Sequence, residues 1–176
     1  MRVAANWRMM CRFSSPLNTM SQPDSSSAPF WHTKSLTEMT REEWDSLCDG
    51  CGRCCLNKVI DDDDQIHTTA VACKLLDLDS CQCKDFPNRW HYVPDCIRFT
   101  ADNLEENLKW LPDSCAYLLL LKGYDLPEWH PLVTGDPNSV HEAGFSVRGM
   151  AVSEEEWPNP DEWHQLIIVT EEEAES

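Results

Sequence analysis

The sequence predicts a small, irregular α+β domain, mostly helical, that is nucleated by metal-bound cysteines. Length and cysteine content predict this class. The 176 residues suit a single domain, and a 41% hydrophobic content supplies only a modest core. Nine of the ten cysteines lie between Cys48 and Cys115. Nine cysteines in 68 residues exceed the roughly 8–10% that marks a cysteine-built scaffold.

The chain divides into three parts by composition. Residues 1–29 carry arginines with no acid before Asp24 and are expected to be a disordered extension, with Met20 as an alternative start, so Cys11 is not expected to bind metal. Residues 30–153 form the predicted cysteine-cluster domain. Residues 154–176 form an expected acidic tail, with Glu171–Ser176 disordered.

The run Cys48-Asp-Gly-Cys-Gly-Arg-Cys-Cys55 indicates a chelating loop. Its glycines permit the positive φ angles that wrap a chain around an ion, and two-residue gaps let sulfurs converge. A disulfide framework is the alternative. It is disfavoured by the odd number of cysteines in the cluster, the lack of a convincing export signal and a spacing poorly suited to internal pairing.

All nine clustered cysteines are predicted metal ligands: Cys48, Cys51, Cys54, Cys55, Cys73, Cys81, Cys83, Cys96 and Cys115. One four-coordinate ion cannot use nine thiols, so two metal sites or a polynuclear cluster are favoured over a single ion with spare cysteines. Alternation along an extended segment places Cys81 and Cys83 on one side. The resulting negative core needs cations nearby, for which the candidates are Arg53, Lys84, Arg89 and Arg98.

The first predicted helix begins near Thr40, where Thr40 and Glu43 form a capping-box pattern. Its Trp44 and Leu47 share one face, so the helix should deliver Cys48 into the core, and the tryptophan is expected to be core packing. Two short strands are predicted over 56–60 and 65–73. The four aspartates between them lack calcium-loop spacing and are expected to form a solvated turn. His67, close by, is a candidate ligand that no spacing demands.

Further helices are predicted from Thr100 to Leu108 and from 114 to 122, the second closed by Gly123 with Cys115 in its first turn. A helix N-terminus favours a thiolate at that position. The proline-rich stretch 125–132 is expected to be an ordered loop, whose pair Trp129-His130 is a candidate for contacts behind the metal ligands or for a surface site. Residues 145–152 alternate like a strand, with Arg148 outward.

Charge and hydropathy argue against nucleic-acid-binding, membrane-binding and membrane-spanning proteins. A formal charge of −17 argues against a nucleic-acid or anionic-membrane partner, although a protein partner remains open. The longest apolar run, 118–121, is far too short to span a bilayer. We therefore expect a soluble, cytoplasmic protein.

The cysteine motifs resemble those of one family. The run CxxCxxCC, followed by Ser80-Cys-Gln-Cys83, Pro94-Asp-Cys-Ile97 and Leu126-Pro-Glu-Trp-His-Pro-Leu132, resembles the YcgN family of the YkgJ-type cysteine-cluster proteins. The resemblance runs from Phe30 to Val152. It implies a small bacterial protein with a predicted zinc- or iron-chelating domain and no established reaction.

The leading hypothesis is therefore a protein whose metal is structural, with zinc preferred to iron. The spacing Cys48-x2-Cys51-x2-Cys54 is that of a ferredoxin half-motif, but Cys55 follows at once, which disfavours a ferredoxin-like iron–sulfur cluster. One alternative is an iron redox protein or a metalloenzyme with an open coordination position, for which the candidates are Cys83, Cys115, His130 and Asp95. A thiol-based redox sensor is another. No nucleotide loop, nucleophile elbow or paired-histidine motif is present in the sequence, so enzymatic activity is the less favoured reading.

Overall fold

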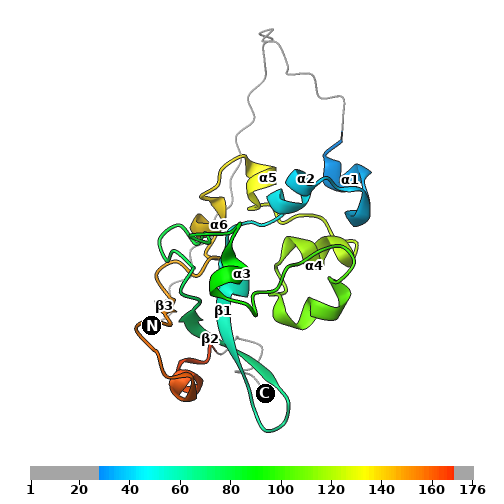
Figure 1. Ribbon diagram of the computed structural model, residues 1–176. Coiled ribbons are helices and arrows are strands. Elements are labelled where there is room, and N and C mark those ends of the chain that lie inside the picture. Colours follow the sequence, from blue (N-terminus) through cyan, green and yellow to red (C-terminus); the bar gives the residue numbers. More distant parts are fainter. Residues whose placement is uncertain (1–27, 169–176) are drawn as a thin grey trace, which may run out of the picture.

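The computed structural model describes residues 28–168, which form short helices around a small sheet (Figure 1). The α-helices are α1 (Phe30–Thr33), α2 (Arg41–Ser46), α3 (Arg89–Tyr92), α4 (Ala116–Leu121), α5 (Pro131–Thr134) and α6 (Ser139–Glu142). The 3-10 helices are η1 (Leu36–Glu38), η2 (Arg53–Cys55), η3 (Glu105–Trp110) and η4 (Pro160–Leu166). The strands are β1 (Leu56–Ile60), β2 (Ile66–Ala72) and β3 (Val152–Ser153). Helices with a small sheet confirm the α+β character. A mostly helical domain is not confirmed, because turns and irregular segments make up much of the described chain.

The predicted hairpin is confirmed. Strands β1 and β2 pair antiparallel, and β3 adds to β2 in parallel through Val152 and Val71, giving the order β1-β2-β3. The aspartates 61–64 form the exposed turn between β1 and β2. The Asp61 carboxylate accepts hydrogen bonds from the N–H groups of Asp63 and Gln65 at 3.0 and 2.8 Å, so this turn is closed by its own backbone.

The N-terminal part of the helical region folds as its local sequence predicts. The Thr40 hydroxyl accepts from the Glu43 N–H at 3.2 Å, and the Glu43 carboxylate accepts from the Thr40 N–H at 2.8 Å, which completes the capping box of α2. Trp44 and Leu47 are buried, as expected. Helix α4 ends at Leu121 and is closed by Gly123, with φ of +79°, but Cys115 is its N-cap rather than a residue of its first turn.

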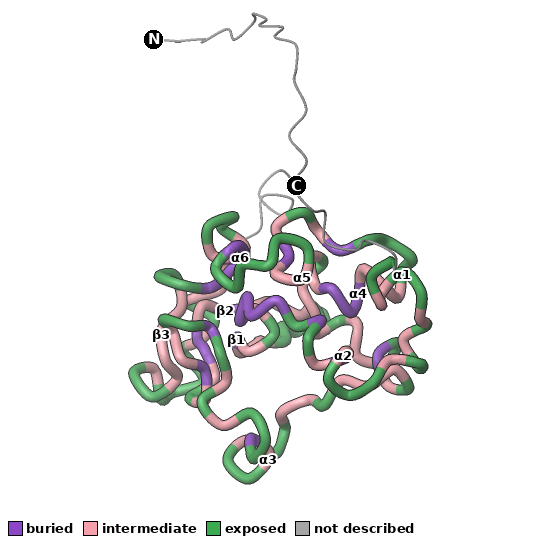
Figure 2. The backbone as a smooth tube through the Cα atoms, turned by 90° about the horizontal axis from the view of Figure 1, so that it is seen from above, coloured by how far each residue is buried: buried purple, intermediate pink, exposed green. Residues whose placement is uncertain are grey.

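Two apolar clusters make up the core. The first joins the helical elements: Trp44, Leu47, Leu104, Ala116, Tyr117 and Leu126. The second lies at the sheet: Leu56, Ala72, Leu76, Cys81 and Val147. Figures 1 and 2 place α1, α2 and α4 at one side of the molecule and β3 at the other. The residues between the two sides, including the cysteine loop, therefore have to tie two small cores together.

Two predicted elements are wrong. The helix expected from Thr100 is the 3-10 helix η3, which begins only at Glu105, because the Asn103 side chain accepts from the Thr100 N–H at 2.9 Å and closes a separate turn before it. The strand expected over 145–152 is a turn up to Val152. The positive φ of Gly149, +76°, breaks the extended backbone there, although Arg148 is exposed as expected.

The C-terminal part of the described chain packs on the sheet. The predicted extension up to residue 27 and the end of the predicted tail, 169–176, lie outside the described residues. Within the predicted tail, the Glu154 N–H donates to the Ala72 carbonyl at 2.9 Å, η4 lies against β2, and the Ile168 N–H donates to the Thr68 carbonyl at 2.8 Å. Across residues 28–168, no helix has the length and apolar character needed to cross a membrane.

Candidate metal centre

The cysteine loop follows directly from α2. Gly50 and Gly52 adopt φ of +74° and +75°, as the sequence predicts for a chain that wraps tightly. A Cβ at Gly52 would lie 2.7 Å from the Val147 side chain, and one at Gly50 would lie 2.6 Å from the Gln82 side chain. Both glycines are therefore required by conformation, and Gly52 is also required by close packing against Val147.

Three backbone contacts fix the loop. The Cys51 carbonyl accepts from the Val147 N–H at 2.9 Å, and the Cys55 carbonyl accepts from the Cys73 N–H at 3.0 Å. His130 is fully buried, with Nε2 3.1 Å from the Leu47 carbonyl, and its Nδ1 accepts from the Leu132 N–H at 3.1 Å. Because Nδ1 is an acceptor, Nε2 carries the proton and donates to Leu47. His130 thus supports the loop from behind.

Five thiols gather at this loop. They form what we call the loop group: Cys48, Cys51, Cys54, Cys55 and Cys115. Cys48 is exposed at the edge of the loop, yet loss of solvation around its sulfur raises its pKa to about 12, and the charge of Cys54 adds to the rise. Burial also raises the pKa of Cys115 to about 12, again with Cys54 as the largest neighbouring charge. Thiols from two distant segments therefore lie near enough for the charge of one to affect the pKa of another.

Cys54 is the exception within the loop group. The hydrogen bond from Cys55, across a sulfur–sulfur distance of 4.0 Å, and the Lys58 ammonium hold the pKa of Cys54 at about 7, although burial opposes them. That same hydrogen bond and burial raise the pKa of Cys55 well above its usual value. Cys54 is accordingly the thiol of the loop group that most readily becomes a thiolate.

Asp49 belongs to this centre and was missed in the sequence. Its Oδ1 accepts from the Cys51 N–H at 2.9 Å, while its Oδ2 is buried and has no partner within the described residues. A buried carboxylate oxygen without a hydrogen bond is costly unless a cation or donor meets it. Its position inside the CxxC motif was the available signal. Asp49 adds an oxygen donor to the loop group.

Three further thiols form a neighbouring set, which we call the outlying group: Cys73, Cys83 and Cys96. Burial raises the pKa of Cys73, and the charges of Glu154, Cys96 and Cys83 contribute. Burial also raises the pKa of Cys96, but the Arg89 guanidinium opposes this by its charge and by a hydrogen bond. The outlying group thus has a cation beside it.

Arg89 is one of the four basic residues predicted to offset the thiols. It is only 6% exposed, and its guanidinium carbon lies 3.8 Å from the ring centroids of both Phe86 and Trp90. Arg53, by contrast, donates from Nε to the Phe145 carbonyl at 2.7 Å beside the loop group. The chain therefore fixes one buried cation at the outlying group by stacking.

Cys81 stands apart from both groups. It is 4% exposed and packs in the second apolar cluster, and its φ of +55° breaks the extended geometry expected for the segment. Burial raises its pKa, while Arg148 and Ser146 act in the opposite direction. The prediction that Cys81 and Cys83 share one side is therefore wrong, because the positive φ turns them toward different surroundings.

The candidates for a catalytic site do not come together. Cys115 lies in the loop group, Cys83 in the outlying group, and His130 has backbone partners on both ring nitrogens. Asp95 is exposed. His67 pairs with Asp61, at 2.8 Å between Nε2 and Oδ2, instead of facing the thiols.

The donor set suits a thiophilic ion, although the side chains do not yet enclose one. Between residues 28 and 168, no three His, Cys, Asp or Glu side chains lie close enough together to hold an ion as they stand. A cysteine has a single side-chain torsion before its sulfur, and one staggered step moves that sulfur by about 3 Å. Asp49 Oδ2 is the buried oxygen that a cation would satisfy.

Comparison with known proteins agrees with this chemistry. Residues 47–116 match the family model CxxCxxCC, described as "Putative zinc- or iron-chelating domain". The chain is 57% identical to a UPF0260 protein of Granulibacter bethesdensis, over 73% of this chain and 77% of that protein. It is 57% identical to one of Shewanella amazonensis (71% and 86%) and 60% identical to one of Gluconacetobacter diazotrophicus (72% and 79%). No solved structure matches the chain.

Proposed function

The chain belongs to the UPF0260 family and carries its CxxCxxCC domain, and from this premise we propose that it is a metal-binding protein whose loop group holds a structural zinc ion. One observation carries the proposal. Besides burial, the charge of the buried Asp49 carboxylate acts to raise the pKa of four loop-group thiols from two distant segments, and its Oδ2 has no partner within the described residues. Such a site concentrates negative charge in a chain of net charge −17 and calls for a cation.

The position of the loop group supports a structural role for the ion. Cys115 packs against the first apolar cluster and Cys55 against the second. An ion held by sulfurs from both would join two cores that are each only five or six buried residues in size. A structural zinc contributes about 10–16 kcal/mol of apparent binding free energy, comparable to the stability of a whole domain.

Zinc is proposed ahead of iron on the chemistry of the motif. Thiolates suit both metals, and the CxxC turn with its following glycine is common to zinc and iron sites. The immediate Cys55 departs from a ferredoxin pattern, which leaves an iron–sulfur cluster as the alternative. The outlying group, with three thiols, is a second candidate site, so up to two ions are proposed. Bound zinc would supply Lewis acidity and hold the thiols deprotonated.

Elemental analysis of protein purified without oxygen, together with its visible absorption spectrum, tests this function. Colourless protein with one or two zinc ions per chain is the expected result. Brown protein with iron and acid-labile sulfide would contradict the zinc proposal and direct attention to electron transfer.

A redox-sensing role is the second candidate, favoured by one observation. The sulfurs of Cys54 and Cys55 lie 4.0 Å apart, and the pKa of Cys54, lowered first by its hydrogen bond with Cys55, is about 7. A thiolate at neutral pH is the form that peroxide oxidises. Zinc release under peroxide that is reversed by a thiol reductant would favour the sensor over a purely structural site.

The cellular setting follows from the same chemistry. All nine cysteines of the described residues are free thiols. Thiols remain reduced in the cytoplasm, so a cytoplasmic location is part of the proposal. The acidic surface, in turn, is suited to a basic protein partner for metal transfer, and not to nucleic acid or an anionic membrane.

A further inference from the structure

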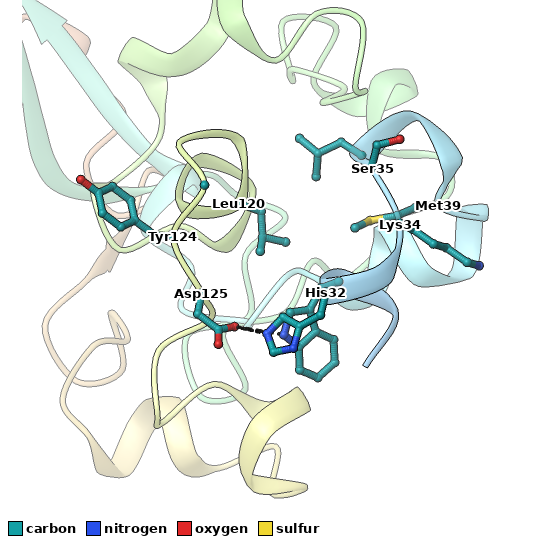
Figure 3. A pocket seen from close by; sticks show the side chains of 10 residues that line it. His32, Lys34, Ser35, Met39, Leu120, Tyr124 and Asp125 are labelled. Carbon is teal, nitrogen blue, oxygen red and sulfur yellow. Dashed lines mark hydrogen bonds and ion pairs between the residues drawn. The ribbon is translucent and has the colours of Figure 1, made fainter. Parts of the chain in front are cut away.

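Two pockets in the described part of the chain differ in how their charges are used. The first, of about 270 Å³, lies between α1 and α4 and is drawn in Figure 3. Figure 3 shows His32 directed at Asp125, and the two side chains are 2.9 Å apart. Lys34 pairs with Glu43 at 2.6 Å. Its charged groups satisfy one another, so this pocket offers little to a ligand.

The second pocket, of about 490 Å³, has an excess of cations. We call it the basic pocket. It lies between the β1–β2 hairpin and the connection from η3 to α4, and its lining includes Arg53, Lys58 and Lys109 against a single carboxylate, Asp113. The whole chain has 14 lysines and arginines against 31 acids. A local excess of positive charge in so acidic a protein marks a place where anions are favoured.

The three cations are held in place without carboxylate partners. Within residues 28–168, ion pairs are made by Lys34, Arg41 and two histidines, and by none of the three cations of the basic pocket. Arg53 donates from Nε to the Phe145 carbonyl at 2.7 Å, and Lys58 donates to the Leu56 carbonyl at 2.7 Å. These neutral partners position the charges but do not cancel them, and the charge of Lys58 is shared with the neighbouring Cys54 thiol.

Most of the remaining lining is apolar, and His67, Thr68 and Ser114 add polar groups to it. Trp110 and Phe145 supply aromatic rings, with the Lys109 ammonium 4.8 Å from the Trp110 ring centroid. The Phe145 ring stacks on Trp129 at 4.4 Å between centroids, which holds that wall rigid. Ser114 also lines the pocket, and its hydroxyl is buried with no partner in the described residues. An unpaired buried hydroxyl is usually matched by water or a ligand.

We propose that the basic pocket binds a small organic anion, with a carboxylate or phosphate on a flat apolar body. The volume is within the usual range for small-molecule sites, which are mostly apolar with a few fixed polar groups. The pocket also adjoins the loop group. Arg53 and Ser114 precede Cys54 and Cys115 in the chain, and the Lys58 ammonium lies 3.4 Å from the Cys54 carbonyl. A bound anion would therefore lie next to the thiols.

Binding of 8-anilino-1-naphthalenesulfonate, an aromatic anion whose fluorescence rises on apolar contact, tests this directly on the full chain. Saturable binding with one site per chain is expected. Lys109→Glu should weaken binding of the probe at least tenfold, because it replaces a cation of the basic pocket with an anion. Lys109 is exposed, so the substitution should leave the fold intact. Lys122→Glu, an equally exposed lysine outside the pocket, is the matched control and should leave the affinity unchanged.

Three further measurements keep the proposal falsifiable. The uncharged probe N-phenyl-1-naphthylamine should not distinguish the two variants. Displacement of the anionic probe by 2-naphthoate or by naphthyl phosphate supports the proposal and identifies the anionic group, whereas displacement by neither overturns it. Ile168 lines the pocket and leads into an acidic sequence. If the anionic probe binds only after Glu171→Gln, Glu172→Gln and Glu173→Gln are combined, the occupant is the chain's own acidic end, and the proposal fails.

Discussion

The loop group and the outlying group are both sets of neighbouring thiols, but they balance their charge differently. Beside the outlying group, the buried Arg89 is stacked between Phe86 and Trp90. The loop group has more thiols and the Asp49 carboxylate, with Lys58 as the cation that lowers the pKa of Cys54 alongside the larger effect of Cys55. The loop group therefore has more negative charge to balance for each neighbouring cation, and on the proposed function it is the group whose folding should depend on a metal ion.

The largest expected effect comes from removing loop-group sulfurs. Cys51→Ser combined with Cys54→Ser should unfold the chain under native conditions, because the loss of a structural ion of about 10 kcal/mol or more exceeds the stability of a small domain. Cys83→Ser combined with Cys96→Ser is the matched control and should stay folded. Circular dichroism during thermal unfolding measures both. A loop-group variant with an unchanged melting temperature would refute the structural role.

A smaller effect is expected at Asp49. Asp49→Asn keeps the hydrogen bond from the Cys51 N–H but removes the charge at Oδ2, so zinc affinity should fall about 10–100-fold, as for the loss of an outer ligand contact. Competition with a chromophoric chelator measures the affinity. Glu42→Gln, at an exposed carboxylate on α2, serves as control. Equal affinity for the Asp49 variant and the wild type would remove this residue from the centre.

The outlying group should respond to the geometry of its cation. Arg89→Lys keeps the charge but loses the planar stack between Phe86 and Trp90, which should cost roughly 1–2 kcal/mol of unfolding free energy. Urea denaturation measures the difference. Arg98→Lys, an exposed arginine 5.5 Å from the Trp90 ring, should change stability by less than about 0.5 kcal/mol. If the two variants behave alike, stacking of Arg89 contributes nothing.

The smallest effect is a pH dependence from His130. Burial lowers the pKa of His130, although the hydrogen bond to the Leu47 carbonyl and the charge of Asp49 act in the opposite direction. In the unfolded chain the imidazole is protonated below about pH 6.5, whereas in the folded chain it stays neutral to lower pH. Stability from this group is therefore full above pH 6.5 and falls as pH falls, by at most about 1.4 kcal/mol per pH unit. His130→Asn should flatten that slope, and an unchanged slope would assign it to other groups.

Interactions between residues close in sequence made the start of α2 and the β1–β2 hairpin predictable. The capping box at Thr40 and the glycines of the loop act within a few residues, so the sequence contains their full cause. The failures have tertiary causes. Cys81 adopts a positive φ inside an apolar cluster, and residues 145–150 form a turn whose Val147 N–H donates to the Cys51 carbonyl. Neither the backbone conformation of Cys81 nor the contact of Val147 with Cys51 can be predicted from the periodicity of the sequence.

The candidate site was predictable as a set of cysteines but not as two groups. Spacing alone treats Cys115 and Cys96 alike, whereas the fold brings the first to the loop group and the second to Arg89. The role of Asp49 depends on one oxygen being buried without a partner, which only coordinates reveal.

Metal content per chain, measured after anaerobic purification of the wild type and the two double-cysteine variants, tests the central claim most directly. Cys83→Ser with Cys96→Ser should retain at least one tightly bound ion, and Cys51→Ser with Cys54→Ser should retain none. A loop-group variant that keeps the full metal content of the wild type, or an outlying-group variant that loses all of it, would contradict the account.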